Sequence, residues 1–192
     1  YKDGIVQFVK QIGENKQVIH SKPIAFHSTK DEIIVDCVMQ YNSSYNDQIL
    51  CFANSIPNSD GGTHLTGFRT ALTRAINQYA KANKLLKDKD PSLSGDDVRE
   101  GLICILSVKL PHPRFESQTK VKLVNAEVEG VVSSIVYEGL MGYFDSNQAL
   151  GKKIVDKCLG SARPRSGTQG ARHGAQDGND RRRPAGQAGR LF

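Results

Sequence analysis

Two long stretches of the chain repeat apolar side chains at the spacing of an α-helix, and they constrain the fold more than any other feature. The first covers residues 61–86 and the second residues 126–143. Such spacing predicts amphipathic helices, the first of about six turns, each with an apolar face that another layer must cover. The residues on these faces are Leu65, Phe68, Leu72, Ile76 and Tyr79 in the first stretch, and Val128, Val131, Val132, Ile135, Val136, Leu140 and Tyr143 in the second.

Four shorter stretches have the patterns of β-strands. Apolar and polar side chains alternate at Ile24 and Phe26 and again over residues 33–39, with a polar turn between them. Residues 48–56 form a third apolar run, and residues 102–106 begin the most apolar of the four. Strands followed by long helices predict an α/β (α+β) domain in which a mixed sheet is packed by the helices.

Polar residues mark where the expected helices begin. Thr63 follows Gly61-Gly62 and stands where it would cap the first helix. Residues 144–148 interrupt the second helix, and Ser146 is the expected cap of a third. That third helix carries Leu150, Ile154 and Cys158 at helical spacing.

The net charge of +6 is distributed unevenly. Residues 161–192 hold seven arginines, no lysine and two aspartates, a net charge of +5. Residues 1–160 keep 19 of the 26 basic and 18 of the 20 acidic side chains, so their net charge is +1. The body of the chain therefore lacks the basic surplus that is typical of nucleic-acid-binding proteins.

The first residues have no signal-peptide pattern, and no apolar run approaches the roughly 18 residues that a membrane span needs. We therefore expect a piece of a longer cytoplasmic chain with no membrane partner.

Residue types that bind metals or act as nucleophiles are scattered. The five histidines are not at ligand spacing, and the cysteines at 37, 51, 104 and 158 form no CxxC pair. All four cysteines lie in apolar segments, so we expect buried free thiols. Asp96, Asp97 and Glu100 lie at a helix start, where the helix dipole favours acidic side chains, so capping explains them better than a metal site does. No metal site, carboxylate pair or Ser-His-Asp set is predicted.

The apolar strand that begins at residue 102 turns abruptly into a polar loop containing the tripeptide Gln118-Thr119-Lys120. The ammonium of Lys120 is a compact charge for a phosphate, and the amide of Gln118 can donate to a phosphoryl oxygen or orient a water. Together the two side chains suit an anion clamp. In most polar loops such residues are simply solvated, and the residues alone favour that interpretation.

Several longer motifs give this loop a context. GGTHLTGF, LTRAIN, DDVREGL, SVK and QTK-x-KL occur in this order between residues 61 and 123. Together they resemble the second domain of the B subunit of bacterial DNA gyrase, and the resemblance covers about residues 2–159. The paralogous topoisomerase IV subunit shares GGTH, SVK and QTK, but DDVREGL and GFRTALTRAIN are more similar to gyrase. Topoisomerase IV remains the alternative.

The resemblance implies a domain order and a set of partners. Residues 1–159 would be a transducer domain of the ribosomal-protein-S5-like α/β fold, between an ATP-binding domain and a metal-binding TOPRIM domain. It would couple ATP binding and hydrolysis to DNA strand passage and negative supercoiling by a type II topoisomerase. The implied partners are double-stranded DNA, a second B subunit and the gyrase A subunit, in a heterotetramer of two A and two B subunits. ATP and Mg²⁺ are the implied cofactors, with the Mg²⁺ ligands outside this sequence.

The resemblance also implies roles for individual residues. Gln118 and Lys120 stand at the positions that contact the ATP γ-phosphate in the family, and Lys120 is the expected catalytic residue. The general base would lie in the ATP-binding domain, so this chain alone is not expected to hydrolyse ATP. Arg69 and Arg74 lie on the helix that lines the family's DNA cavity, where a weak phosphate contact competes with ordinary solvation. Gly61-Gly62-Thr63-His64 fits a turn that starts a helix better than an anion site.

The composition changes at residue 160, beyond which there is neither lysine nor apolar periodicity. Residues 160–172 can be back-translated with codons that encode AARAREAARKAR when the reading frame is shifted by one base. This sequence resembles the family's continuation. Residues 186–192 treated in the same way give GKLADC, which resembles the start of the TOPRIM domain. We therefore interpret residues 160–192 as out-of-frame translation of that link, and expect no secondary structure or packed contacts from about residue 161.

A non-catalytic nucleic-acid-binding module is the rival interpretation from a different functional class. It rests on the S5-like fold and on the arginine-rich residues 160–192, which would then form a DNA-binding arm. The nearly neutral body and the QTK loop argue against it. A mismatch-repair ATPase of the same superfamily is a third alternative, but it would lack GGTHLTGF and DDVREGL.

Overall fold

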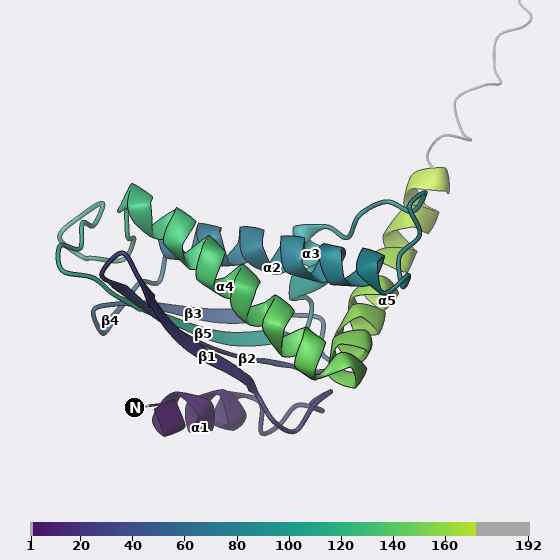
Figure 1. Ribbon diagram of the computed structural model, residues 1–192, viewed down its shortest axis with the longest axis horizontal. Helices are drawn as coiled ribbons and strands as arrows, with labels where there is room; N and C mark the ends of the chain where they lie inside the picture. Colours follow the sequence, from purple (N-terminus) through teal and green to yellow (C-terminus); the bar gives the residue numbers. More distant parts are fainter. Residues whose placement is uncertain (1, 172–192) are drawn as a thin grey trace, which may run out of the picture.

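A five-stranded mixed sheet with helices on both faces forms the centre of the molecule (Figure 1). The computed structural model describes the backbone of residues 2–171 and the side chains of residues 3–162. The strands are ordered β1-β2-β5-β3-β4 across the sheet. β3 pairs with β5 in parallel, whereas the other neighbouring strands are antiparallel. The strands are β1 (Ile24–Lys30), β2 (Ile33–Tyr41), β3 (Gln48–Ala53), β4 (Ile56–Pro57) and β5 (Leu102–Lys109).

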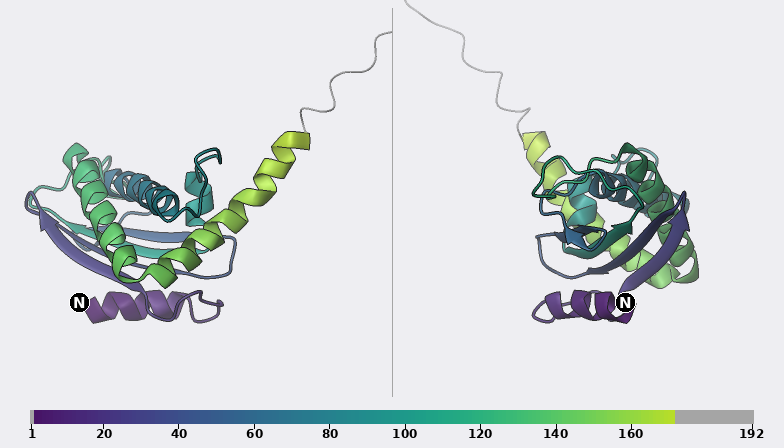
Figure 2. Two further views of the ribbon diagram at one scale, coloured as in Figure 1. Left: turned by 45° about the vertical axis from the view of Figure 1, so that its right-hand side comes forward. Right: turned by 90° about the vertical axis from the view of Figure 1, so that its left-hand side faces the viewer.

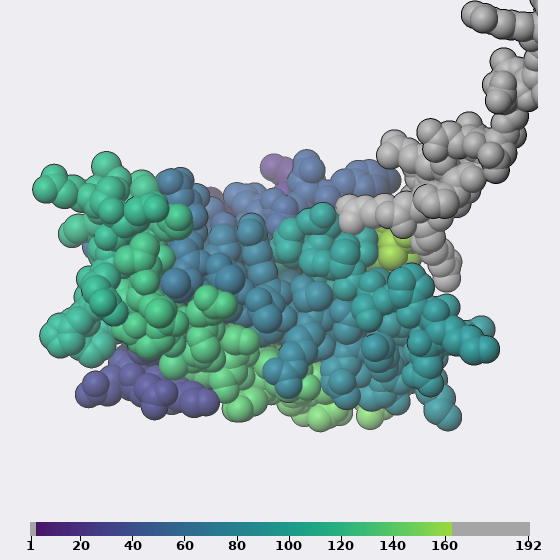
Figure 3. All heavy atoms as spheres, turned by 90° about the horizontal axis from the view of Figure 1, so that it is seen from above, coloured from purple at the N-terminus to yellow at the C-terminus, as the bar shows by residue number. Residues whose placement is uncertain are grey.

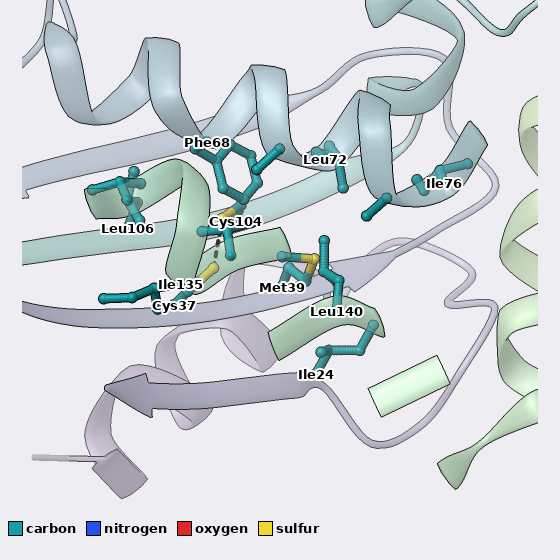
Figure 4. Close-up of a cluster of buried hydrophobic side chains, with 14 of the residues drawn as sticks. Ile24, Cys37, Met39, Phe68, Leu72, Ile76, Cys104, Leu106, Ile135 and Leu140 are labelled. Atoms are coloured by element: carbon teal, nitrogen blue, oxygen red, sulfur yellow. Dashed lines mark hydrogen bonds between the residues drawn. The ribbon is translucent and has the colours of Figure 1, made fainter. Parts of the chain in front are cut away.

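Two long helices, α2 and α4, lie side by side over one face of the sheet, which confirms the predicted mixed α/β fold (Figures 1 and 4). The predicted apolar stripes face the sheet, and Phe68, Leu72 and Ile76 of α2 are fully buried. Burying each such side chain stabilises the fold by roughly 1.5–3 kcal/mol. The helices are α1 (Lys2–Ile12), α2 (Thr63–Ala82), α3 (Gly95–Arg99), α4 (Ala126–Ser146) and α5 (Gln148–Ala171).

The opposite face of the sheet is covered in part by α1 (Figures 1 and 2). Val9 of α1 packs on Val38 of β2 and on Ile103 and Ile105 of β5. β5 is therefore buried from both sides, which is why its sequence is a continuous apolar run instead of an alternating one.

The four cysteines are buried and free, as predicted. Cys37 of β2 and Cys104 of β5 face α2 from neighbouring strands, with 3.9 Å between their sulfur atoms (Figure 4). Burial raises the pKa of the Cys51 and Cys158 thiols to about 12. These thiols therefore behave as small apolar side chains of the core.

The third predicted strand is divided by a tight turn. Residues 48–56 were expected to form one strand, but β3 ends at Ala53 and the chain reverses into β4 at Ile56. The two residues between them, Asn54 and Ser55, have φ angles of 47° and 67°. Two consecutive left-handed residues make the type of hairpin turn that matches the twist of the flanking strands.

Three of the residues predicted to cap helix starts, Thr63, Ser146 and Glu100, do not do so, and Asp97 is confirmed. Thr63 is the first helical residue of α2, and Gly62 occupies the cap position without a side-chain hydrogen bond. Ser146 belongs to the last turn of α4, and Asn147 separates this helix from α5. In α3, Ser94 and Asp97 form a reciprocal capping box, so Asp97 does cap the helix start, whereas Glu100 follows the last residue of this short helix.

Helix α5 contradicts the expectation that secondary structure ends near residue 161. It continues to Ala171, and in Figure 2 its second half extends away from the rest of the domain. Ala162 still packs against the core. The physical reason is that Ile154, Val155 and Cys158 anchor the helix in the core, after which each added residue completes one more hydrogen bond. Residues 172–192, the rest of the proposed out-of-frame segment, lie outside the described residues.

None of the helices described, from residue 2 to residue 171, has a stretch long and apolar enough to cross a membrane.

Candidate functional site

The loop that follows β5 forms one end of the molecule, seen in teal and green at the left edge of Figure 3. It leaves β5 after Lys109 and reaches α4 at Ala126. Near its tip the outgoing and returning legs pair, because the amide of Glu116 donates to the carbonyl of Lys122 at 3.0 Å. Phe115 and Leu123 form a bridge of the same ladder. The tripeptide Gln118-Thr119-Lys120 therefore sits on a braced projection.

The outgoing leg is fixed by the buried side chain of Asn125. Its amide oxygen accepts a hydrogen bond from the backbone amide of Arg114 at 2.6 Å, and its amide nitrogen donates to the carbonyl of His112 at 3.0 Å. The side chain is 1% exposed. One asparagine thus satisfies two backbone groups that no strand pairs, which is the usual function of a buried amide in a loop.

The returning leg is joined to the turn that precedes α2. The amide of Asp60 donates to the carbonyl of Val121 at 2.9 Å. The amide of Leu123 donates to the carbonyl of Gly61, and the amide of Thr63 donates to the carbonyl of Leu123, both at 3.1 Å. The glycine-rich turn therefore holds the loop and starts the helix. This arrangement supports the interpretation of Gly61-Gly62-Thr63-His64 as the start of a helix, in preference to an anion-binding site.

The tip presents its two candidate residues to solvent. Gln118 and Lys120 are both exposed, and neither side chain has a hydrogen bond or ion pair with any residue whose side chain is described. Ser117 and Thr119 bond to each other through their hydroxyls at 2.6 Å. An unpaired ammonium beside an unpaired amide is chemically able to bind a phosphoryl group presented from outside the domain.

Beneath the tip lie two residues that the motif analysis did not single out for this loop, Asn58 and His64. The amide nitrogen of Asn58 donates to the main-chain carbonyl of Lys120 at 2.7 Å. The amide oxygen of Asn58 faces Nε2 of His64 at 3.1 Å. The side chain of His64 is fully buried, and burial lowers its pKa to about 4, so the ring is neutral at physiological pH.

Arg69 and Arg74, the two residues predicted to line a DNA cavity, are both exposed residues of α2. The guanidinium of Arg74 lies over the ring of Tyr137 on α4, 4.4 Å from the ring centroid. Arg69 instead borders a shallow hollow of about 300 Å³ beside the returning leg of the loop, together with Lys122.

Two of the acidic side chains near α3 form ion pairs with basic side chains. Asp96 accepts a hydrogen bond from Arg99 at 2.6 Å, and Glu100 is paired with Lys157 at 3.5 Å. Over the residues that the structure describes, no group of three or more histidine, cysteine, aspartate or glutamate side chains is placed to hold a metal ion.

Comparison with known proteins assigns the chain to a family. The family model described as DNA gyrase B matches residues 4–173. The gyrase B subunit of Clostridium acetobutylicum is 46% identical over 173 residues, and that of Streptococcus pneumoniae is 45% identical over 172. Each alignment covers 90% of this chain, which spans about a quarter of the length of these relatives.

Solved structures agree with the sequence comparison. The 43K ATPase domain of Thermus thermophilus gyrase B, in complex with an aminocoumarin, matches with a TM-score of 0.82 and 40% identity. That match covers 90% of this chain and 46% of the solved one. The topoisomerase IV ATP-binding domain of Francisella tularensis matches with a TM-score of 0.73 and 25% identity, over 86% of this chain and 44% of the other. The chain belongs to the DNA gyrase B family.

Proposed function

We propose that residues 1–159 are the transducer domain of a gyrase B subunit, and that Gln118 and Lys120 contact the γ-phosphate of an ATP bound by the neighbouring domain. The chain corresponds to less than half of the Thermus thermophilus ATPase domain that it resembles. The remainder of such a domain would supply the adenine and ribose contacts, the general base and the Mg²⁺ ligands. The chain alone would therefore not hydrolyse ATP.

One observation carries this proposal. The loop tip carries an unpaired ammonium and amide out into solvent, while both legs of the loop are fixed by hydrogen bonds to the domain. A loop that only connects two elements does not need both of its legs fixed to the domain by hydrogen bonds. A rigid projection with unsatisfied donors is what one domain requires in order to reach a phosphate held by another.

The proposed coupling follows from when the contact exists. Gln118 and Lys120 bind the γ-phosphate only while ATP is intact, so ATP favours the closed arrangement of the two domains. Hydrolysis removes this differential affinity and allows the domains to separate. In the assembled cytoplasmic enzyme of two A and two B subunits, this cycle would drive strand passage through double-stranded DNA and negative supercoiling.

Topoisomerase IV is the second candidate, because an ATP-binding domain of that enzyme shares the fold. The higher identity and TM-score of the gyrase structure favour gyrase. In contrast, the nucleic-acid-binding module rested on the S5-like fold and on the basic residues 160–192, whereas the family model that matches residues 4–173 is that of DNA gyrase B.

The proposal predicts that Lys120→Ala weakens nucleotide-dependent closure of full-length B subunits. A charge-assisted hydrogen bond contributes about 1.5–3 kcal/mol, so the equilibrium constant for closure should fall roughly ten- to a hundredfold. The measurement is the fraction of closed dimers, by analytical ultracentrifugation, with a non-hydrolysable ATP analogue. Closure as complete as in the unaltered subunit would contradict the γ-phosphate contact.

We also propose that Arg69 and Arg74 meet the transported DNA duplex. Replacing both with alanine in the holoenzyme should weaken the stimulation of ATPase activity by DNA, because two phosphate contacts are lost. Basal ATP turnover should be unchanged. The single variants separate the two side chains, and Arg69 should carry the larger effect, because Arg74 is already stacked on Tyr137. Full stimulation in the double variant would make both residues ordinary surface arginines.

A further inference from the structure

We infer that Asn58 and His64 are positioning residues for Lys120: the buried Asn58–His64 pair fixes the main chain of Lys120 and so aims its ammonium. This inference rests on the γ-phosphate contact proposed for Lys120. Neither Asn58 nor His64 would touch the nucleotide.

The main chain of Lys120 adopts an uncommon conformation. Its φ angle is 58°, in the left-handed region that side chains other than glycine, asparagine and aspartate rarely occupy. Such a residue is retained only where its surroundings hold it, and outliers of this kind cluster at functional sites. The conformation decides where the Cα–Cβ bond points, and hence where the ammonium can reach.

Two hydrogen bonds hold Lys120 in this conformation. On one side its amide donates to the carbonyl of Ser117 at 3.1 Å, which closes the turn at the tip. On the other side its carbonyl accepts the 2.7 Å bond from Asn58, a residue 62 positions earlier in the chain. The second bond is the one that ties the tip to the body of the domain.

Asn58 is itself held from two sides. Its backbone amide donates to the carbonyl of Cys51 on β3 at 2.8 Å, and its side chain is 3% exposed. Since its amide nitrogen faces Lys120, its oxygen must face His64, so Nε2 of the neutral imidazole carries the proton and donates. The bond from Nε2 of His64 thus supports the orientation in which the Asn58 amide nitrogen reaches Lys120.

Within the described part of the chain, only one ring nitrogen of His64, Nε2, makes a hydrogen bond. Its Nδ1 atom is buried and has no hydrogen-bond partner among the described residues. A buried polar atom without a partner destabilises the fold, so an apolar side chain would suit the site better if only packing mattered. The donor at Nε2 is what an apolar side chain lacks.

The test compares four variants of the full-length subunit in the holoenzyme: Asn58→Ala, His64→Leu, His64→Gln and Asn77→Ala. Asn58→Ala should lower kcat for ATP on the order of tenfold, because a small displacement of a reacting group is costly, while KM stays within about twofold. His64→Leu should lower kcat in the same direction. His64→Gln should restore most of the rate, because its amide places an N–H near the position of Nε2.

Asn77→Ala is the matched control. The side chain of Asn77 also ties the main chain of a loop residue to the body of the domain. It bonds to the carbonyl and the amide of Leu93, near α3, at 3.0 and 2.8 Å. Its loss should lower the thermal stability of the subunit without changing kcat per active site, counted by titration with a non-hydrolysable ATP analogue. If Asn58→Ala does not fold, the two His64 variants decide the question.

A double variant separates this inference from the proposed function. If Asn58 acts through Lys120, Asn58→Ala should cause no further loss of kcat when Lys120 is already alanine. Normal kcat in Asn58→Ala and His64→Leu, with slow turnover in Lys120→Ala, would overturn the positioning role and leave the γ-phosphate contact standing. Additive losses in the double variant would also overturn it. Normal turnover in Lys120→Ala would reject both proposals.

Discussion

Replacing Lys120 with alanine in the full-length subunit should slow ATP turnover on the order of a hundredfold, because one lost oxyanion-type contact typically costs ~3 kcal/mol in the transition state. Nucleotide affinity should fall much less. Under the proposed function, the neighbouring domain would bind adenine and ribose, whereas the γ-phosphate would lose a positive partner as negative charge shifts during the transfer. The measurement is steady-state ATP hydrolysis, together with equilibrium binding of a non-hydrolysable analogue.

Substitutions at two other residues of the same loop serve as comparisons for Lys120→Ala. Gln118→Ala should have a smaller effect, since a neutral amide makes a weaker hydrogen bond to phosphate than an ammonium does. Lys122→Ala is the control for charge alone, because Lys122 is two residues away and is paired with Glu116 at 3.3 Å. If Lys120→Ala hydrolyses ATP at the normal rate, or if Lys122→Ala is equally slow, the specific role of Lys120 is lost.

The folded state should tolerate these changes well. Gln118 and Lys120 are exposed, and within the described part of the chain their side chains make no hydrogen bond or ion pair that a truncation would remove. Surface substitutions of this kind usually change stability by less than about 0.5 kcal/mol. A loss of turnover in Lys120→Ala would therefore report on chemistry and not on unfolding.

Helices α2 and α4 were predictable because their signal is local. Three- and four-residue spacing of large apolar side chains requires a buried stripe whatever the rest of the chain does, and Phe68 and Leu140 are indeed fully buried. The mixed sheet followed from the same kind of periodic reading. The exposed loop tip was expected from the change of a fully apolar strand into a polar segment.

Features that depend on distant parts of the chain were not predictable in this way. The cap of α2 was assigned to Thr63 because its sequence neighbours allow it, but the helix already begins at Thr63, whose amide donates to the carbonyl of Leu123 in the returning leg of the loop. The Asn58–Lys120 bond joins residues whose proximity appears only after β5 and the loop have folded. The Asn54-Ser55 turn did leave a signal, since asparagine is enriched at left-handed positions, but the apolar residues around it hid that signal.

The continuation of α5 has a different cause. Residues 161–171 lack apolar periodicity, and this absence was interpreted as an absence of structure. A helix that is already nucleated and anchored needs no apolar stripe in order to add further turns, because each added residue gains a hydrogen bond without a new nucleation cost. Periodicity therefore predicts which part of a helix is buried better than it predicts where the helix ends.

A methyl group at position 62 should be among the most damaging small changes in the domain. A Cβ atom on Gly62 would lie 2.3 Å from the carbonyl oxygen and 2.6 Å from the amide nitrogen of Leu123, and backbone atoms cannot rotate away as a side chain can. The φ angle of 137° adds strain for any residue other than glycine. Gly62→Ala must therefore push the returning leg of the loop away from the start of α2.

The expected cost follows from what that movement breaks. Two backbone hydrogen bonds of Leu123 are lost at about 1 kcal/mol each, and Leu123, now 1% exposed, is partly withdrawn from the core. With the backbone strain, the total is on the order of 4 kcal/mol, equivalent to roughly 10 °C in the unfolding temperature of a domain of this size. Hydrogen exchange should show lost protection at the amides of Thr63 and Leu123, and ATP turnover should fall because Lys120 lies on the displaced leg.

Gly130→Ala is the matched control for this change. Gly130 lies in α4, where an added Cβ atom meets no other atom within 4 Å. Alanine in a helix is favoured over glycine by up to about 1 kcal/mol, so the same chemical change should raise the unfolding temperature there. The two substitutions should shift the unfolding temperature in opposite directions. The methyl group at position 130 enters open space, whereas the one at position 62 pushes two hydrogen-bonded segments apart. If the Gly62→Ala and unaltered subunits were equally stable, the hydrogen bonds between the loop and the start of α2 would contribute nothing to stability. The proposal that these bonds hold Lys120 in a fixed position would then be contradicted.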